Sequence, residues 1–226
     1  MIKIFLHICT LGEYQKILDE LVNNIIESGL LDSANELNIC IVGDGFINKI
    51  SNEKIKYNHV GNIEDFEFPT LQFIEDEINK TDFNFKVLYL NGLGVTNNSN
   101  FKISWRKYLS YFNIQCYGEC VKALNDYDTC GVDWRTNPVP HYSGNFWWAN
   151  SNYLKKLPKI QTLNKPNSPI ILTLRHNAEM YIGMCSTVNP RVLHQSNISQ
   201  YERHLYEYPS LNYINKISEE NIIKSV

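Results

Sequence analysis

The sequence of 226 residues lacks any strong charge of one sign and any long apolar run. Its formal net charge is only −3, and its lysines and arginines form no basic stripe, which argues against nucleic acid as a partner. No segment approaches the roughly 20 apolar residues that a membrane-spanning helix needs. The first apolar run is interrupted by His7 and is too short for a secretory signal. These absences predict a cytoplasmic protein without a membrane span.

Motifs that bind zinc or dinucleotides are also missing. The six cysteines include no C-x-x-C pair, and no neighbouring histidine completes a metal set. They are typical of a reduced protein whose cysteines serve as small buried hydrophobic residues. After the first predicted strand, Cys9-Thr10-Leu11-Gly12 stands where a dinucleotide-binding protein would carry G-x-G-x-x-G. A Rossmann oxidoreductase is therefore disfavoured.

The chain does have the composition and the periodicity of an α/β domain. Hydrophobic residues make up 43% and charged residues 20% of the sequence, as in ordinary globular proteins. Apolar runs at 2–8, 37–42, 55–60 and 85–90 predict buried strands, and helical periodicity separates the first two and the last two. The order β-α-β-β-α-β predicts a Rossmann-like, open and mostly parallel sheet with helices on both faces. We expect one domain over residues 1–226.

The second half of the chain is less regular. Apolar spacing predicts an amphipathic helix over 101–112, a second helix through 120–124 and a short strand at 129–132. A helical turn is expected at 152–157, a surface loop at 161–169 and a helix at 174–184. A last short helix is expected at 214–223. In the first half of the chain, a helix is expected to begin at Thr70, which follows Pro69 and would be the N-cap residue.

Polar residues follow the predicted strands at the edge where ligands of open α/β sheets bind. His7 and Thr10 end the first strand, Asp44 follows the second, and Asn91 and Gly92 follow the fourth. Asp44 is placed to accept a hydrogen bond from a base or a ribose. An Asp-Gly turn that merely reverses the chain explains it equally well.

The segment His141-Tyr-Ser-Gly-Asn-Phe-Trp-Trp-Ala149 carries half of all the tryptophan in the chain. Gly144 permits close backbone approach, and Asn145 offers both a donor and an acceptor. In a strand, Trp147 and Trp148 would point to opposite faces, one into the core and one outward. The segment fits either the wall of a small-molecule site or a core strand with a tight turn.

These nine residues, followed by Tyr153 and Leu157-Pro158, resemble the signature of a family of GT-A-type glycosyltransferases of bacteria and large DNA viruses. The similarity extends over about residues 85–179 and includes Trp105-Arg106 and Arg175-x-x-x-Glu179. It implies a GT-A fold, a nucleotide-sugar donor and a glycan, glycoprotein or other hydroxyl acceptor. For a viral member, the location would be the host cytoplasm.

The resemblance also implies roles for individual residues. Arg106 is either a diphosphate ligand or a surface arginine beside a core tryptophan. Glu179 is either a general base or the partner of Arg175 in an i,i+4 salt bridge. The expected assignments are as follows: His7, Thr10, Asp44 and Arg106 hold the nucleotide; Asn91 and Gly92 shape the diphosphate loop; His141, Ser143, Asn145 and Trp148 contact donor sugar or acceptor; and Glu179 or Asp133 is the base.

One departure from the family bears on activity. Many GT-A enzymes carry an Asp-x-Asp pair after the fourth strand that holds Mn²⁺ or Mg²⁺ against the donor diphosphate. Relatives with the double-tryptophan signature are expected to have His-Thr-Lys-Gly there, whereas this chain reads Asn91-Gly-Leu-Gly94. We therefore assign no residue as a metal ligand, and Mn²⁺ or Mg²⁺ stays open as a cofactor without an Asp-x-Asp pair to hold it. The alternative function is an inactive relative that binds a nucleotide or a glycan.

Overall fold

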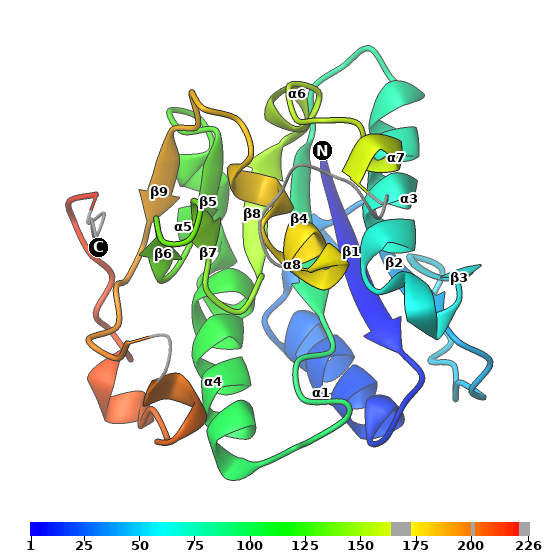
Figure 1. Cartoon of the computed structure of the whole chain (residues 1–226), viewed down its shortest axis with the longest axis horizontal. Helices are drawn as coiled ribbons and strands as arrows, with labels where there is room; N and C mark the ends of the chain where they lie inside the picture. Colours follow the sequence, from blue (N-terminus) through cyan, green and yellow to red (C-terminus); the bar gives the residue numbers. More distant parts are fainter. Residues whose placement is uncertain (164–172, 200–201, 222–226) are drawn as a thin grey trace.

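The computed structural model describes residues 1–163, 173–199 and 202–221 and contains a central seven-stranded sheet (Figure 1). All pairs are parallel except those of β8, which runs antiparallel to both of its neighbours. In sheet order the strands are β3 (Ile55–Gly61), β2 (Glu36–Val42), β1 (Ile2–Cys9), β4 (Lys86–Asn91), β8 (Trp147–Asn150), β5 (Thr129–Gly131) and β9 (Pro190–Val192). A two-stranded sheet joins β6 (Trp134–Arg135) and β7 (His141–Tyr142).

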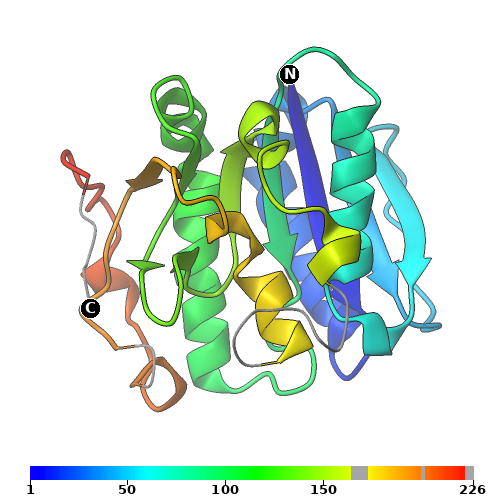
Figure 2. The same cartoon turned by 45° about the horizontal axis from the view of Figure 1, so that its top comes forward.

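Helices cover both faces of this sheet, as Figures 1 and 2 show. One face packs against α1 (Tyr14–Glu27), α2 (Leu30–Ser33), α4 (Asn100–Ser110) and α5 (Tyr117–Ala123), with a π-helical turn at Tyr111–Gln115 after α4. The other face packs against α3 (Phe68–Asn79), α6 (Ser151–Leu154), α7 (Ile160–Leu163) and α8 (Leu174–Glu179). The expected Rossmann-like α/β class, with an open and mostly parallel sheet between two helical layers, is confirmed.

Several local predictions need correction. The helix expected to begin at Thr70 begins at Phe68, with Pro69 in its first turn, where a missing N–H costs nothing. Thr70 is fully buried and contacts His7 instead of capping the helix. The helix expected at 174–184 ends at Glu179 and is followed by a 3-10 turn, η3 (Tyr181–Gly183). In the surface loop expected at 161–169, residues up to Leu163 belong to α7, and the rest lies outside the described residues.

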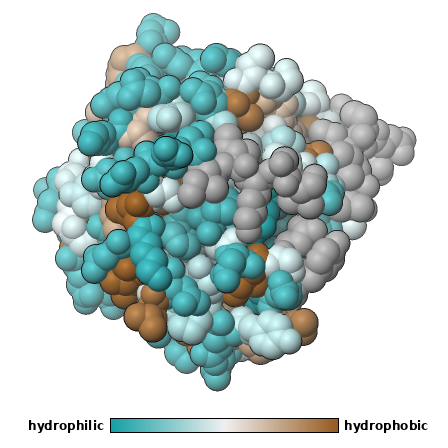
Figure 3. All heavy atoms as spheres, turned by 90° about the vertical axis from the view of Figure 1, so that its left-hand side faces the viewer, coloured by the Kyte–Doolittle hydropathy of each residue, from teal (hydrophilic) through white to brown (hydrophobic). Residues whose placement is uncertain are grey.

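The C-terminal segment packs along α4 and forms no α-helix over 214–221, the described part of the helix expected there. It contains the 3-10 turns η4 (Glu202–His204) and η5 (Ser210–Asn212). Tyr208 and Tyr213 lie edge-on to Tyr108, with ring centres 5.0 and 5.2 Å away. The surface on this side is mostly hydrophilic, with separate hydrophobic patches (Figure 3). Within the described ranges, no helix has both the length and the apolar character that a membrane crossing requires.

The two tryptophans of β8 point to opposite faces, but neither points to solvent. Trp147 is 1% exposed and stacks on Tyr89, with ring centres 4.9 Å apart. Trp148 is 0% exposed on the other face and donates a 2.9 Å hydrogen bond from Nε1 to the Asn113 carbonyl. The expectation that one ring points outward is wrong, because a sheet covered on both faces buries both sides of its strands.

Gly183 gives the fold a sharp test. A methyl group there would lie 1.7 Å from the Pro140 carbonyl oxygen, next to β7, whereas one at Gly118 in α5 would meet no atom within 4 Å. Gly183→Ala should therefore lower the free energy of unfolding by about 1–3 kcal/mol, the usual cost of overpacking. Gly118→Ala should raise it by about 0.5–1 kcal/mol through helix propensity. Urea denaturation measures both, and equal stabilities for the two variants would contradict the packing of η3 on Pro140.

Candidate functional site

Polar side chains gather at the carboxyl ends of β1 and β4, on the face that α3 and α8 cover. His7 and Asn91 are register partners at these two strand ends. The Asn91 side-chain amide donates to the carbonyl oxygens of Gly144 and Asn145, at 3.3 and 3.5 Å. The amide of Gly92 donates to the His7 carbonyl at 2.9 Å. The loop after β4 and the turn before β8 are therefore in contact, although about 50 residues separate them in sequence.

Asn145 connects this turn to both the core and an acidic group. Its φ is +58°, a left-handed conformation that asparagine tolerates better than most residues. Its Oδ1 accepts a 2.9 Å bond from Trp147 Nε1, and its Nδ2 donates a 2.7 Å bond to Glu67 Oε2. An indole nitrogen can only donate a hydrogen bond, so the oxygen of the Asn145 amide faces Trp147 and its nitrogen faces Glu67. Glu67, Asn91, Asn145 and Glu179 are together called the strand-end cluster below.

Glu67, at the start of α3, carries the most unusual charge state of the cluster. Burial raises its carboxyl pKa to about 8, with a further rise from the nearby charge of Glu179; Arg175, Tyr89 and Asn145 act in the opposite direction. Glu67 therefore holds a proton near neutral pH. No motif in the sequence marks this residue. The sequence indicated this residue only by its position: Glu67 stands just before α3, and the strand that precedes α3 ends at the ligand edge.

Glu179 makes the ion pair that one of the two readings of the sequence expected. Arg175 Nε donates to its Oε1 at 2.9 Å, as the i,i+4 spacing predicts. The Glu179 side chain is nevertheless only 31% exposed, and its charge acts on the pKa of both Glu67 and His141. An ion pair with Arg175 therefore leaves Glu179 inside the cluster.

Both candidate histidines are neutral. Burial lowers the pKa of His7 to about 4, and its Nδ1 lies 2.8 Å from the Thr70 hydroxyl. Burial also lowers the pKa of His141, whose Nδ1 lies 2.7 Å from the Val139 carbonyl. Because a carbonyl oxygen only accepts, Nδ1 of His141 carries the proton and its Nε2 is left as an acceptor.

Arg106 does not contact the ligand edge as expected. It is 1% exposed, and its Nε and Nη2 donate to the carboxylate of Glu20 in α1 at 3.0 and 2.6 Å. Its Nη1 donates to the Leu93 carbonyl at 2.7 Å and to Asn98 Oδ1 at 3.2 Å. Four of its five N–H donors are thus used by protein groups. Arg106 holds the loop after β4 against α1, which disfavours the expected role as a diphosphate ligand.

Asp133 is likewise unsuited to the role of base. It is 1% exposed, and its carboxylate accepts bonds of 2.8 and 2.9 Å from Arg135. Further bonds come from the Gln195 side chain and from the amide and hydroxyl of Ser196. A carboxylate buried and bonded in this way stabilises the junction of β6 with the C-terminal segment, and its burial keeps an acceptor hydroxyl away from it.

Two residues of the signature also lie away from any ligand. The ring of Trp148 is sealed in the core against Asn113, so it does not contact a sugar. Ser143 is 0% exposed, and its hydroxyl accepts a hydrogen bond from Arg203. The signature therefore shapes the Asn145 turn, and its only ligand-edge groups are Asn145 and His141.

The remaining predicted residues lie at the end of β2. Thr10 is buried, donates to the Val42 carbonyl at 3.2 Å and accepts from the Gly45 amide at 3.0 Å. The Thr10 hydroxyl group holds the loop in place, because its donor and an acceptor position are both used by the backbone. The Asp44 side chain is 98% exposed, 3.6 Å from His59 Nε2, and is free to meet a ligand.

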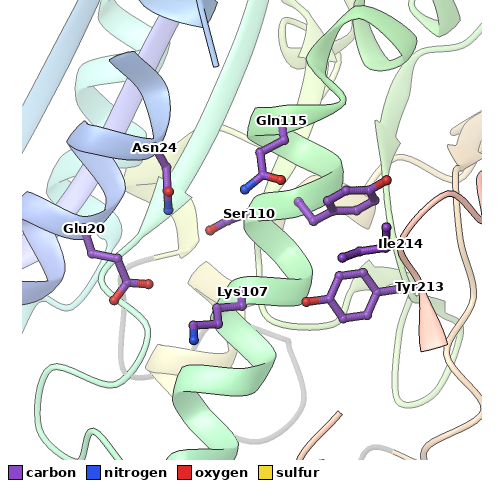
Figure 4. A pocket seen from close by; sticks show the side chains of 8 residues that line it. Glu20, Asn24, Lys107, Ser110, Gln115, Tyr213 and Ile214 are labelled. Carbon is purple, nitrogen blue, oxygen red and sulfur yellow. The ribbon is translucent and has the colours of Figure 1, made fainter. Parts of the chain in front are cut away.

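The described part of the chain holds no ready-made metal centre. No group of three or more His, Cys, Asp or Glu side chains converges there in a geometry that could hold an ion. Two hollows, of about 280 and 360 Å³, are lined by residues outside the strand-end cluster. The smaller lies between α1, α4 and the C-terminal segment (Figure 4) and is lined by Glu20, Asn24, Lys107, Ser110, Tyr111, Gln115, Tyr213 and Ile214.

The fold and the strand-end cluster define an α/β protein of the Rossmann-like class with acidic and amide groups at the carboxyl edge of its sheet. The chain belongs to the family described as "Domain of unknown function (DUF8361)", which matches residues 11–203. No curated protein matches its sequence. Among solved structures, it is similar to the 4-diphosphocytidyl-2C-methyl-D-erythritolsynthase from Anaerococcus prevotii DSM 20548, with 10% identity, a TM-score of 0.42 and coverage of 91% of this chain and 95% of that chain.

The proton on Glu67 predicts a pH-dependent stability. Folding raises its carboxyl pKa from 4.5 to about 8, so the stability contributed by this proton is present at low pH and is lost as pH rises through this window. Glu67→Gln, which is always neutral, should therefore gain about 1–3 kcal/mol over the wild type between pH 5 and pH 9.

Thermal melts across this pH range measure the difference. Glu53→Gln, at an exposed carboxylate, is the control and should track the wild type at every pH. A constant difference between Glu67→Gln and the wild type would show that Glu67 titrates normally.

Proposed function

We propose that this chain is a glycosyltransferase that moves a sugar from a nucleotide-sugar donor to a glycan or other hydroxyl acceptor. The observation that carries the proposal is the Glu67–Glu179 pair at the carboxyl edge of the sheet, in which Glu67 is held by Asn145 of the signature segment and Glu179 by Arg175. Ligands of open α/β sheets bind at this edge. Paired carboxylates of which one keeps a proton are suited to proton transfer near neutral pH.

In the proposed reaction Glu179 is the general base. The acceptor hydroxyl oxygen attacks the anomeric carbon, its proton passes to the Glu179 carboxylate, and the bond between the sugar and the diphosphate breaks. Glu67, protonated near pH 7, keeps the pair at a single negative charge. His141, neutral and accepting at Nε2, is placed to orient a hydroxyl group.

The donor nucleoside is proposed to lie over the ends of β1 and β2. Asp44 is the exposed acceptor there, suited to a ribose hydroxyl or a base amine. Phe46, in the same loop, is 79% exposed and offers an aromatic face for a base. Thr10 pins this loop to β1 and supports the site without touching the ligand.

A second candidate is a relative that binds a nucleotide or a glycan without turning it over. Two observations favour this candidate. The loop after β4 has no lysine or arginine between Asn91 and Asn100, and the Arg106 side chain is paired with Glu20. Both candidates share the ligand site and differ only in turnover.

Release of nucleoside diphosphate from UDP-, GDP- and TDP-sugars separates them. For the donor that is used, Glu179→Gln should lower kcat about 10²–10⁴-fold, the usual contribution of a general base, with little change in the donor Kd. Glu53→Gln, far from the cluster in sequence and exposed, should leave both constants unchanged. Donor binding without turnover would support the inactive relative, and no binding at millimolar donor would contradict both candidates.

A further inference from the structure

Three cationic side chains from separate elements lie beside residues of, or next to, the strand-end cluster. Lys102, in the first turn of α4, stands over the loop after β4, since a methyl group at Gly94 would lie 3.5 Å from its Cβ. Arg175 comes from α8 and pairs with Glu179. Arg203 comes from η4, which packs on α4, and donates to the hydroxyl of Ser143.

The positive charges of Arg175 and Arg203 act on Lys102. The pKa of Lys102 is lowered by burial and then by the positive charges of Arg175 and Arg203, against which Glu179 acts. Burial lowers the pKa of Arg203 too, and Asp133 and Glu179 oppose this effect. Like charges held together in a partly buried place repel, and an anion between them would relieve this repulsion.

Among the described residues, Glu179 is the carboxylate that acts against the positive charges around Lys102. Glu67 holds its proton near neutral pH, and Asp133 is bound by Arg135. The ligand edge between α4 and α8 therefore offers Lys102 and Arg175 one ionised carboxylate, Glu179. In the described ranges it also lacks the carboxylate set that a divalent cation needs.

We propose that Lys102, Arg175 and Arg203 form an anion site that holds the donor diphosphate without a divalent metal ion. A diphosphate that leaves a sugar gains negative charge, and three fixed cations stabilise this charge as a metal ion would. The arginines offer planar forks of N–H donors that match phosphate oxygens. That the bound anion is a donor diphosphate rests on the proposed function, whereas the anion site itself does not.

Calorimetric titration of the full chain with inorganic pyrophosphate in the presence of EDTA tests the site. Binding is expected without metal and should weaken as salt concentration rises. Lys102→Ala should raise the Kd about tenfold or more, and Lys102→Arg should restore most of the affinity. Lys107→Ala is the matched control, because Lys107 lies on the same helix but lines the groove between α1 and α4.

Pyrophosphate binding that requires Mn²⁺ or Mg²⁺ would overturn the proposal. Equal losses for Lys102→Ala and Lys107→Ala, in variants with unchanged thermal melts, would overturn it too. Metal-free pyrophosphate binding that depends on Lys102, together with no turnover of any sugar donor, would uphold the anion site and reject the transferase. Sugar transfer that is lost in EDTA but unchanged by Lys102→Ala would uphold the transferase and reject the anion site.

Discussion

The side-chain amide of Asn145 joins the core of this protein to its ligand edge. One end accepts from Trp147, whose ring is held by stacking on Tyr89 in β4, and the other end donates to Glu67 at the start of α3. Rotating the amide would break both bonds and leave two buried groups unpaired, at about 1–3 kcal/mol each. The position of an acidic group at the ligand edge is thus set by the packing of a tryptophan in the interior.

The loop after β4 depends on a second long-range interaction. Arg106 spans from Glu20 in α1 to the carbonyl of Leu93, so one buried guanidinium holds the loop that lies under Lys102. The same interaction explains why the sequence alone suggested that Arg106, an arginine next to the core, binds a ligand. Four of its five N–H donors are used inside the protein, and the cationic side chains near the ligand edge come from α4, α8 and η4 instead.

The regular half of the fold was predictable from the sequence because β1, α1, β2 and β4 carry local hydrophobic periods. The antiparallel direction of β8 was not predictable. This strand has only four residues, and their sequence does not reveal that they pair with Leu88 in β4 and Cys130 in β5. Asn145 and Glu179 were identified as candidates from short motifs. The engagement of Arg106 and Asp133 was invisible, because their partners lie 86 and 63 residues away. Glu67 was missed because desolvation, which alters its charge, leaves no sequence pattern.

The central claim is that the strand-end cluster, and not a hollow elsewhere, binds an activated sugar through its diphosphate. A crystal structure of the chain with a nucleoside diphosphate, grown in EDTA, tests this most directly. The account predicts phosphate oxygens within hydrogen-bond distance of Lys102 or Arg175, with the nucleoside toward Asp44. A nucleotide seated in the groove between Glu20 and Tyr213, or phosphates that contact none of the three cations, would contradict it.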